Sequence, residues 1–246
     1  MAAKKRLLLI SNSTLHGSGY LDHAESEIRS FLDHRRAGAR VLFFPYALRD
    51  RDGYAARARA RLGAIGCALE SMHEIDGLAD ARRSMTDALN RADVFFVGGG
   101  NTFRLLDCLH RLGLVAPIRR RVEEGKPYIG SSAGAIVAGP TLKTTKDMPI
   151  VQPPSFDALD LVPFQISPHY LDPDPASTHM GETQEERIVQ YLEENDATVV
   201  GLREGSMLRV EGAAARLAGR TAARIFEKGR APVEVQPGAD LDLLLR

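Results

Sequence analysis

The sequence predicts an α/β protein whose sheet is doubly wound and mostly parallel, with helices on both faces. Before residue 131, short apolar runs alternate with longer amphipathic runs, as strands alternate with helices in such folds. Right-handed crossovers between parallel strands would place helices on both faces of the sheet. From residue 207 onward, strand-like runs alternate with glycine turns, which indicates an antiparallel C-terminal edge.

Each element is placed by its hydrophobic pattern. Strands are expected at residues 7–10, 41–44, 68–73, 94–97, 128–130, 164–168 and 197–202. Helices are expected at residues 21–32, 54–65, 82–91, 102–112, 115–124 and 183–192. No internal repeat and no linker interrupts the chain, so residues 1–246 are expected to form a single domain.

The composition argues against several classes of protein. The 32 Lys and Arg residues balance the 32 Asp and Glu residues, so neither nucleic acid nor a membrane surface is expected as a partner. The two cysteines, Cys67 and Cys108, have no metal-ligand spacing and predict no disulfide, and no metal or cofactor is expected. The apolar run at residues 7–10 is too short for a signal peptide, and no segment approaches the length of a membrane span. A cytoplasmic location is therefore expected.

Residues 130–134, Gly-Ser-Ser-Ala-Gly, match the G-x-S-x-G pattern of a nucleophile elbow. A predicted strand precedes the pattern, and the small residues 133–138 can begin a helix. Small neighbours let the chain turn sharply, so that Ser132 projects and the N–H of Ala133 points at a developing oxyanion, aided by the positive end of the helix. The alternative is a small-residue turn that only packs a helix on the sheet. Ser131 is the competing hydroxyl, at the variable position of the pattern.

A second loop follows the strand at residues 94–97 and consists of three consecutive glycines, residues 98–100. A phosphate cradle is a weak interpretation, because no Lys follows the glycines and the G-x-G-x-x-G spacing is absent. We expect instead that the N–H of Gly99 or Gly100 forms an oxyanion hole together with that of Ala133. A plain tight turn is the alternative.

A serine nucleophile needs a base, and His169 is the best candidate. It follows a predicted strand that ends in Pro168, at an edge where α/β sites assemble. The other histidines lie in polar contexts and are expected to be solvated: His16, His23, His34, His73, His110 and His179.

Two carboxylates are candidates for the acid that orients His169. Glu204 follows the strand at residues 197–202, whereas Asp147 gives the chain order Ser, Asp, His of other elbow hydrolases. We expect Glu204 to bond directly to His169, and Asp147 to lie close enough to tune the site. The reverse assignment, with Asp147 as the orienting acid and Glu204 binding the substrate amine, stays open.

Together these segments resemble the peptidase E family of α-aspartyl dipeptidases. Ordered matches run from residue 8 to about residue 205 and include residues 97–103, 129–135, 144–151, 156–161, 168–170 and 181–183. The resemblance implies a fold like that of class I glutamine amidotransferases and metal-free cleavage of dipeptides that begin with aspartate, through an acyl-enzyme on Ser132. By position it implies Ser132 as nucleophile, His169 as base, and Asp147 and Glu204 as acids.

Small peptides are the partners that this resemblance implies, and a homodimer stays open. The residues expected to bind substrate are Asn101, Lys143, Lys146 and Arg187. Two positions depart from the family pattern. Gln184 stands where relatives often carry Arg after Gly-Glu-Thr, and Ser131 replaces a bulky aromatic of some relatives. The specificity for aspartate, which requires a cation, is therefore less firmly implied than the reaction.

Three alternatives remain beside the dipeptidase. A cyanophycinase-like hydrolase of aspartyl-arginine peptides shares the elbow but would need an acidic groove for arginine. A glutamine amidotransferase would need cysteine at the elbow and Glu two residues after the histidine, where Leu171 stands. A non-catalytic binding module on the same fold would have no need of an intact Ser132, His169 and two acids.

Overall fold

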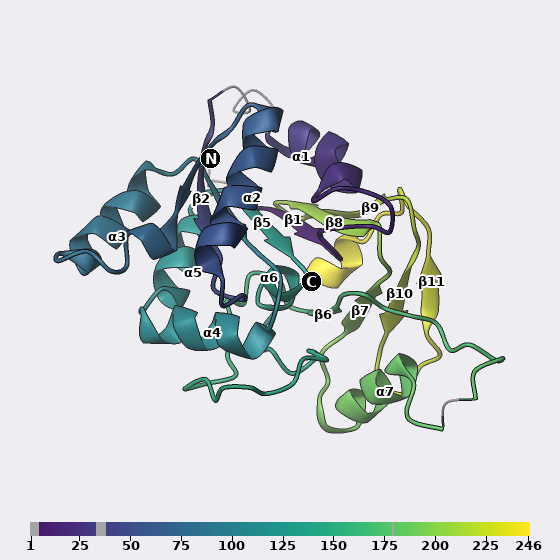
Figure 1. Ribbon diagram of the computed structural model, residues 1–246. Coiled ribbons are helices and arrows are strands. Elements are labelled where there is room, and N and C mark those ends of the chain that lie inside the picture. Colours follow the sequence, from purple (N-terminus) through teal and green to yellow (C-terminus); the bar gives the residue numbers. More distant parts are fainter. Residues whose placement is uncertain (1–4, 33–37, 179) are drawn as a thin grey trace.

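The computed structural model describes residues 5–32, 38–178 and 180–246, whose strands form two β-sheets (Figure 1). The larger sheet has seven strands in the order β3-β2-β4-β5-β1-β8-β9. Strands β1 to β5 run parallel, whereas β8 and β9 are antiparallel, which confirms the predicted antiparallel edge. The strands are β1 (Arg6–Ile10), β2 (Arg40–Phe44), β3 (Ala68–Ser71), β4 (Val94–Val97), β5 (Tyr128–Ser131), β8 (Ser206–Glu211) and β9 (Ala214–Gly219).

Helices cover both faces of this sheet, so the predicted doubly wound arrangement is confirmed. The chain crosses the sheet in one direction from β1 to β3 and returns through β4 to β5, and right-handed crossovers therefore place α1 and α2 opposite α3, α4 and α5. Two separate apolar clusters reflect this, one containing Ile28 and Leu62, the other Leu89, Leu105 and Ile118. The helices are α1 (Glu25–Leu32), α2 (Arg51–Ile65), α3 (Ala81–Arg91), α4 (Thr102–Arg111) and α5 (Val115–Glu123).

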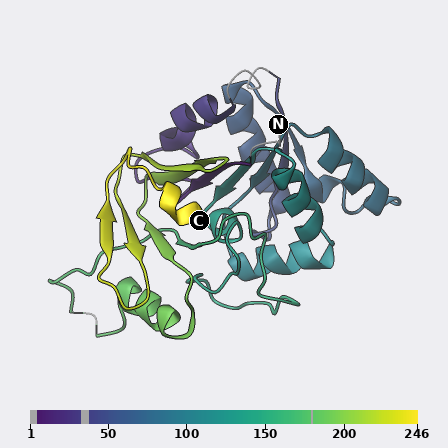
Figure 2. The same ribbon diagram turned by 180° about the vertical axis from the view of Figure 1, so that it is seen from behind.

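The smaller sheet differs from expectation, because the sequence predicted a single sheet. Its four strands lie in the order β11-β10-β7-β6, beside the larger sheet in both views (Figures 1 and 2). They are β6 (Gln165–Ser167), β7 (Val199–Leu202), β10 (Ala223–Phe226) and β11 (Val233–Val235). Helix α7 (Gln184–Glu194) packs on this sheet through Ile188 and Leu192, which contact Phe226 and its neighbours in a third apolar cluster.

Two elements differ slightly from the predicted bounds, and short helical segments complete the chain. Helix α2 begins at Arg51, three residues earlier than predicted, because the Asp50 carboxylate caps it by accepting the Gly53 N–H. The strand predicted at residues 68–73 ends at Ser71, where a capping box starts a 3₁₀ turn. The short segments are η1 (Asp22–Ala24), η3 (Met72–Glu74), α6 (Ala133–Ile136) and η4 (Asp242–Leu245).

The carboxyl ends of the parallel strands position the candidate site. In register, Ile10 of β1 lies beside Ser131 of β5, and Val97 of β4 lies beside Gly130. The segments that follow these three strands therefore meet at one edge of the sheet, as ligand-binding loops do in open α/β sheets. Within the described residues, no helix is both long enough and apolar enough to cross a membrane. That residues 1–246 fold as one domain stays a prediction.

Candidate active site

Ser132 occupies a strained turn between β5 and α6. Its backbone has φ +53°, a left-handed conformation that is uncommon for residues other than glycine. The flanking glycines permit this turn, because a Cβ on Gly130 would lie 2.4 Å from the Gly134 carbonyl oxygen, and one on Gly134 would lie 2.1 Å from that of Val97. The Ser132 N–H donates to the Ile10 carbonyl oxygen at 2.9 Å, which fixes the turn on β1.

The Ser132 hydroxyl lies next to the imidazole of His169. Its Oγ is 2.9 Å from His169 Nε2, within hydrogen-bonding distance. His169 follows β6 and also has a left-handed backbone, with φ +52°. The competing hydroxyl of Ser131 is fully buried and has no hydrogen-bond partner among the described residues. Of the two serines, only Ser132 therefore has a base at hand.

Glu204 contacts the opposite side of the same imidazole. Its Oε1 lies 2.7 Å from His169 Nδ1. The two residues meet because β6 and β7 pair in parallel, with Ser167 beside Gly201, so that both segments emerge at the same edge. The two side chains are 40% and 46% exposed, and an exposed pair of this kind contributes little to stability. At 2.7 Å the carboxylate can accept a hydrogen bond from Nδ1–H, and this contact can orient the imidazole.

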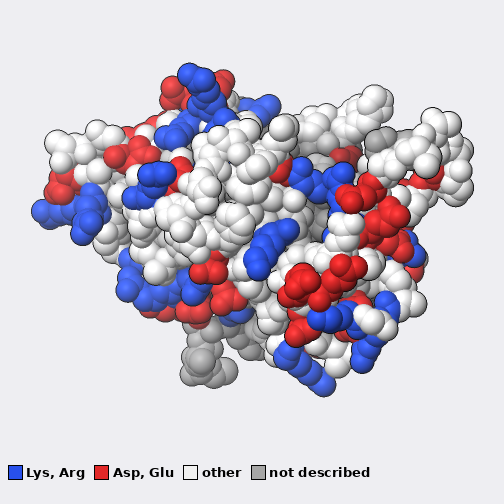
Figure 3. Space-filling view, turned by 90° about the horizontal axis from the view of Figure 1, so that it is seen from below, with Lys and Arg blue, Asp and Glu red and all other residues white. Residues whose placement is uncertain are grey.

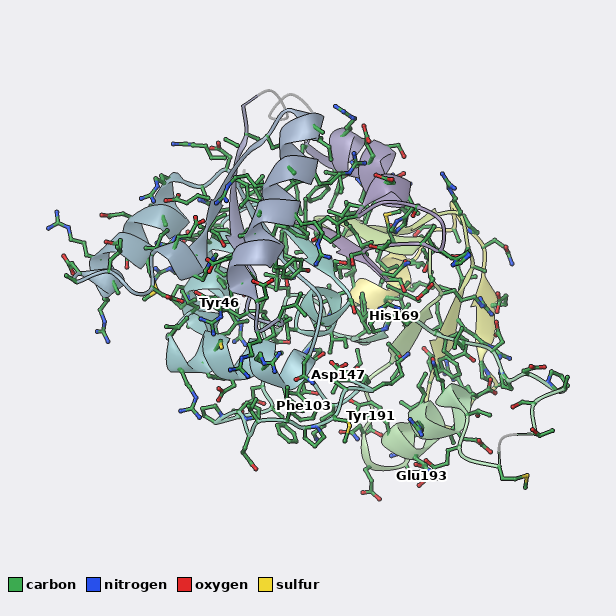
Figure 4. All side chains as sticks on the ribbon, in the orientation of Figure 1. Tyr46, Phe103, Asp147, His169, Tyr191 and Glu193 are labelled. Atoms are coloured by element: carbon green, nitrogen blue, oxygen red, sulfur yellow. The ribbon has the colours of Figure 1, made fainter. Side chains whose placement is uncertain are left out.

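Asp147 occupies a different position, at the start of α4 (Figure 4). Its Oδ2 accepts hydrogen bonds from the Thr102 N–H at 2.7 Å, the Thr102 hydroxyl at 2.6 Å and the Thr145 hydroxyl at 3.0 Å. A carboxylate at a helix N-terminus satisfies free N–H groups and complements the helix dipole. Asp147 thus anchors its loop to α4, and the structure does not place it in contact with His169.

Asn101 is also engaged in holding this region together. Its Oδ1 accepts the Arg104 N–H at 3.0 Å and caps α4, while its Nδ2 donates to the Met148 carbonyl oxygen at 2.9 Å. Both polar atoms of the side chain are therefore already bonded. Its expected contact with substrate stays a prediction.

The structure of the glycine loop favours one of the two glycines whose N–H was expected to form the oxyanion hole. The Gly99 N–H donates to the Tyr54 hydroxyl at 2.8 Å and is therefore directed at that tyrosine. Gly100 has φ +130°, and neither its N–H nor that of Ala133 has a protein acceptor within the described part of the chain. Gly100 is thus the better candidate of the two. Helix α6 has only four residues, shorter than the run 133–138 suggested, so its dipole can add little.

A cationic pocket lies beside the His169 turn. The Lys146 Nζ donates to the carbonyl oxygens of Pro168 at 2.8 Å and His169 at 2.9 Å. Partial burial of this ammonium lowers the pKa of Lys146 to about 8, against the opposing influence of Asp147 and Glu204. The residues that line the pocket are Lys143, Thr144, Thr145, Lys146, Ser167, Gln184, Arg187, Ile188 and Tyr191.

Three of the four residues expected to bind substrate thus line one pocket, and two of them, Lys143 and Arg187, have only long contacts within the protein. Lys143 Nζ lies 3.4 Å from Asn195 Oδ1, and Arg187 Nε lies 3.6 Å from Glu182 Oε2. Gln184, which stands where relatives often carry Arg, uses its Oε1 to accept the Leu171 N–H at 2.9 Å. The positive charge of the pocket therefore comes from Lys143, Lys146 and Arg187.

The prediction that the remaining histidines are solvated is wrong for His23. It is 7% exposed, and neither ring nitrogen has a hydrogen-bond partner among the described residues. Burial lowers its pKa. The segment η1 turns His23 inward with its buried neighbours Leu21 and Ala24.

Two further histidines are partly buried and bonded. His73 contacts Ser71 and Asp52, and His110 Nε2 lies 2.8 Å from the Asp157 carbonyl oxygen. His16 is exposed, whereas His34 and His179 lie outside the described residues. No group of three or more His, Cys, Asp or Glu side chains in the described ranges could hold a metal ion.

The sequence reasoning did not single out two residues that contact the site. Tyr54 of α2 holds the Gly99 amide, and Ser11 accepts the His169 N–H at 2.9 Å. Ser11 had a recognisable signal, because a polar residue directly after the first buried strand must lie at the carboxyl edge of the sheet. Tyr54 lies within a helix, and the sequence alone does not reveal which loop its hydroxyl reaches.

Comparison with known proteins gives consistent matches over nearly the whole chain. The model of peptidase family S51 matches residues 7–218. A protein of Streptomyces coelicolor named "Peptidase E" is 56% identical over 97% of this chain and 94% of its own length. A Drosophila melanogaster protein named "Probable alpha-aspartyl dipeptidase" is 45% identical over the full length of both chains.

A solved structure supports the fold. The crystal structure of a peptidase from an acI-B1 actinobacterium has a TM-score of 0.73, with 16% identity over 98% of this chain and 97% of the other. At this identity the likeness bears on the fold alone.

Proposed function

The chain belongs to peptidase family S51 and is a serine-type peptidase, and from this premise we propose that it hydrolyses dipeptides with an N-terminal aspartate through an acyl-enzyme on Ser132. The observation that carries the proposal is the continuous chain of contacts from Ser132 through His169 to Glu204, at 2.9 and 2.7 Å. A nucleophile next to a base that is oriented by a third group is the arrangement of a serine hydrolase triad.

Each step of the proposed reaction is assigned to one of these three side chains. His169 Nε2 takes the Ser132 proton as the hydroxyl attacks the peptide carbonyl, and Glu204 accepts a hydrogen bond from Nδ1–H and stabilises the imidazolium. The same imidazolium then protonates the leaving amine, which leaves an ester on Ser132. Water, deprotonated by His169, attacks this ester, and His169 returns the proton to the departing Ser132 oxygen, which releases aspartate and the free hydroxyl.

A panel of dipeptides tests the reaction and its specificity. We expect Asp-Leu to be cleaved, and Glu-Leu, Asn-Leu and a β-aspartyl-arginine peptide to be cleaved far more slowly. Release of the second amino acid, followed by mass spectrometry, measures each rate. Equal cleavage of Asp-Leu and Asn-Leu would contradict the specificity, and preferred cleavage of the β-linked peptide would favour the cyanophycinase-like alternative.

The oxyanion hole is proposed to consist of the N–H groups of Gly100 and Ala133. A Cβ placed on Gly99 would lie 2.9 Å from the Cβ of Ser132, which shows how closely the glycine loop approaches the nucleophile. In a crystal structure of the enzyme with a phosphonate ester on Ser132, we expect both N–H groups to lie roughly 2.7–3.1 Å from one phosphonyl oxygen. If both the Gly99 and Gly100 N–H groups point away from that oxygen, the loop has another function.

We assign the aspartate side chain of the substrate to the cationic pocket beside His169. Lys146 links this pocket to the triad. Its Nζ donates a hydrogen bond to the His169 carbonyl oxygen, and its positive charge interacts with the negative charge of Glu204. Arg187 can offer a planar, bidentate set of donors to a carboxylate, as could the Arg that relatives often carry at the position of Gln184. A pocket of this charge repels an arginine side chain, which argues against a cyanophycinase-like substrate.

Replacing Arg187 with glutamine is expected to lower the preference for Asp-Leu over Asn-Leu. A hydrogen bond to a charged group contributes about 1.5–3 kcal/mol, so kcat/KM for Asp-Leu should fall roughly 10- to 100-fold. The value for Asn-Leu should change little, because its side chain is neutral. Steady-state kinetics on both substrates checks this, with Arg83→Gln on the exposed face of α3 as the matched control. Equal losses on both substrates would place Arg187 outside the side-chain pocket.

Small peptides are the partners that this function requires. The face seen from below in Figure 3 carries Lys and Arg interspersed with Asp and Glu, which is consistent with a partner other than a polyanion. We propose the cytoplasm as the site of the reaction, because Cys67 and Cys108 form no disulfide with each other and a reducing compartment is compatible with that. A homodimer remains open to measurement by sedimentation.

A further inference from the structure

We propose that Ser11 and Asn12, which directly follow β1, are positioning residues that hold the His169 and Glu204 turns against the Ser132 turn. The inference rests on the proposed function, because it concerns the geometry of the same triad. It assigns a role to the polar segment after the first strand, which takes no direct part in the chemistry described above.

Ser11 bonds to both segments of the smaller sheet that carry the triad. Its Oγ accepts the N–H of His169 at 2.9 Å and donates to the Leu202 carbonyl oxygen at 2.8 Å. The same carbonyl accepts the N–H of Tyr170 at 2.9 Å, so the chain around His169 is tied to the end of β7 twice. Ser11 is 0% exposed, so these contacts are shielded from bulk water.

Asn12 holds the Glu204 turn in the same way. Its Oδ1 accepts the N–H of Gly205 at 2.8 Å, and its Nδ2 donates to the Thr14 carbonyl oxygen at 3.0 Å, which fixes the orientation of the amide. Asn12 is 1% exposed. Both polar groups of this buried side chain are thus bonded, and the contact to Gly205 locates the turn that carries Glu204.

Three consecutive residues therefore each locate one member of the triad. The Ile10 carbonyl holds the Ser132 N–H, Ser11 holds His169, and Asn12 holds the residue after Glu204. This matters because Ser132 belongs to the larger sheet and the other two follow strands of the smaller one, and no strand pairing in the described ranges joins the two sheets. The three residues at the end of β1 therefore hold the three turns of the triad in place relative to one another.

His169 needs this support because its backbone is left-handed, with φ +52°. A residue in a sparsely populated conformation stays there only when the surrounding structure fixes it. Ser11 fixes its N–H and Lys146 fixes its C=O, at 2.9 Å each. Loss of the Ser11 contact frees the peptide to turn, and it moves the imidazole relative to Ser132.

Replacing Ser11 with alanine is expected to lower kcat for Asp-Leu roughly 10- to 100-fold with little change in KM, because a displacement of about 1 Å in a catalytic group can cost this much. The matched control is Ser71→Ala. Ser71 is also 0% exposed, ends the parallel strand β3, and lies 2.7 Å from a histidine, His73, that takes no part in the site. Both variants should lower the melting temperature, but only Ser11→Ala should lower kcat.

Two further variants separate positioning from general destabilisation. Ser11→Cys gives a slightly larger side chain of the same shape with a weaker donor and acceptor, so its kcat should lie between those of the parent and Ser11→Ala. In a His169→Ala background, Ser11→Ala should cause no further loss, since its effect passes through His169. An unchanged kcat in Ser11→Ala, an equal loss in Ser71→Ala, or an additive loss beside His169→Ala would each overturn the inference.

Ser132→Ala, measured in parallel, keeps the two claims apart. Full activity in that variant would contradict the proposed function itself. An inactive Ser132→Ala together with a fully active Ser11→Ala would leave the function standing and remove only the positioning role. Should Ser11→Ala fail to fold, the comparison of Ser11→Cys with Ser71→Ala decides the same question.

Discussion

Replacing Ser132 with alanine is expected to lower kcat for Asp-Leu by roughly 10⁶-fold, the loss seen when a serine hydrolase is deprived of its nucleophile. The physical reason is that Ser131, the neighbouring hydroxyl, is fully buried, whereas the Ser132 hydroxyl lies at His169 Nε2. The fold should persist, because the glycines on either side permit the turn and alanine is no larger than serine. Steady-state kinetics and a melting curve measure both outcomes.

His169→Ala is expected to be about as damaging as Ser132→Ala, and the double variant hardly worse than either. Residues that act as a unit in one step give losses that do not add. If the two losses multiply, His169 has a structural role and another group acts as the base. Activity of Ser132→Ala within about tenfold of the parent would remove the assignment of the nucleophile itself.

Local patterns were enough to predict the main sheet and the sharp turn at Ser132. Wholly apolar runs mark β1, β2 and β4 because these strands are buried on both faces. The elbow could be recognised because its pattern is local: Gly130 approaches Gly134 within the turn itself, directly after an apolar strand. His169 and Glu204 could be located because each comes directly after a strand, and the ends of parallel strands share an edge.

Non-local contacts were beyond the reach of those patterns. The smaller sheet is separate because β8, which follows β7 in the chain, pairs with β1, about 200 residues earlier, and not with β7. No local signal in the sequence encodes this pairing. The Gly99 N–H donates to the hydroxyl of Tyr54, 45 residues away, and this contact depends on how α2 packs on the sheet. His23 was expected to be solvated because its place on a predicted helix face was read as polar, yet η1 buries it.

Glu204→Gln is expected to lower kcat by roughly 10⁴-fold, because loss of the orienting carboxylate leaves the histidine in the wrong tautomer or orientation. Glutamine keeps the size of the side chain, so the change removes the charge at the position 2.7 Å from His169 Nδ1 without removing its packing. KM should change little, since the contact acts mainly on the imidazolium that forms during the reaction.

Asp147→Asn is the matched control, because it neutralises the other candidate carboxylate without changing its size. Asp147 bonds to Thr102 and Thr145 at the start of α4, so its loss should lower stability by about 0.3–1 kcal/mol, the usual effect of a charge at a helix end, while kcat stays within about tenfold of the parent.

The reverse assignment of the two acids would give the reverse kinetic pattern, and the same measurements on Asp-Leu would reveal it. If Glu204→Gln keeps kcat and only raises KM, then Glu204 binds the free amine of the substrate, because such a contact exists in the ground state and the transition state alike. In that case the acid that orients His169 must be sought at Asp147, after a movement of its loop away from α4.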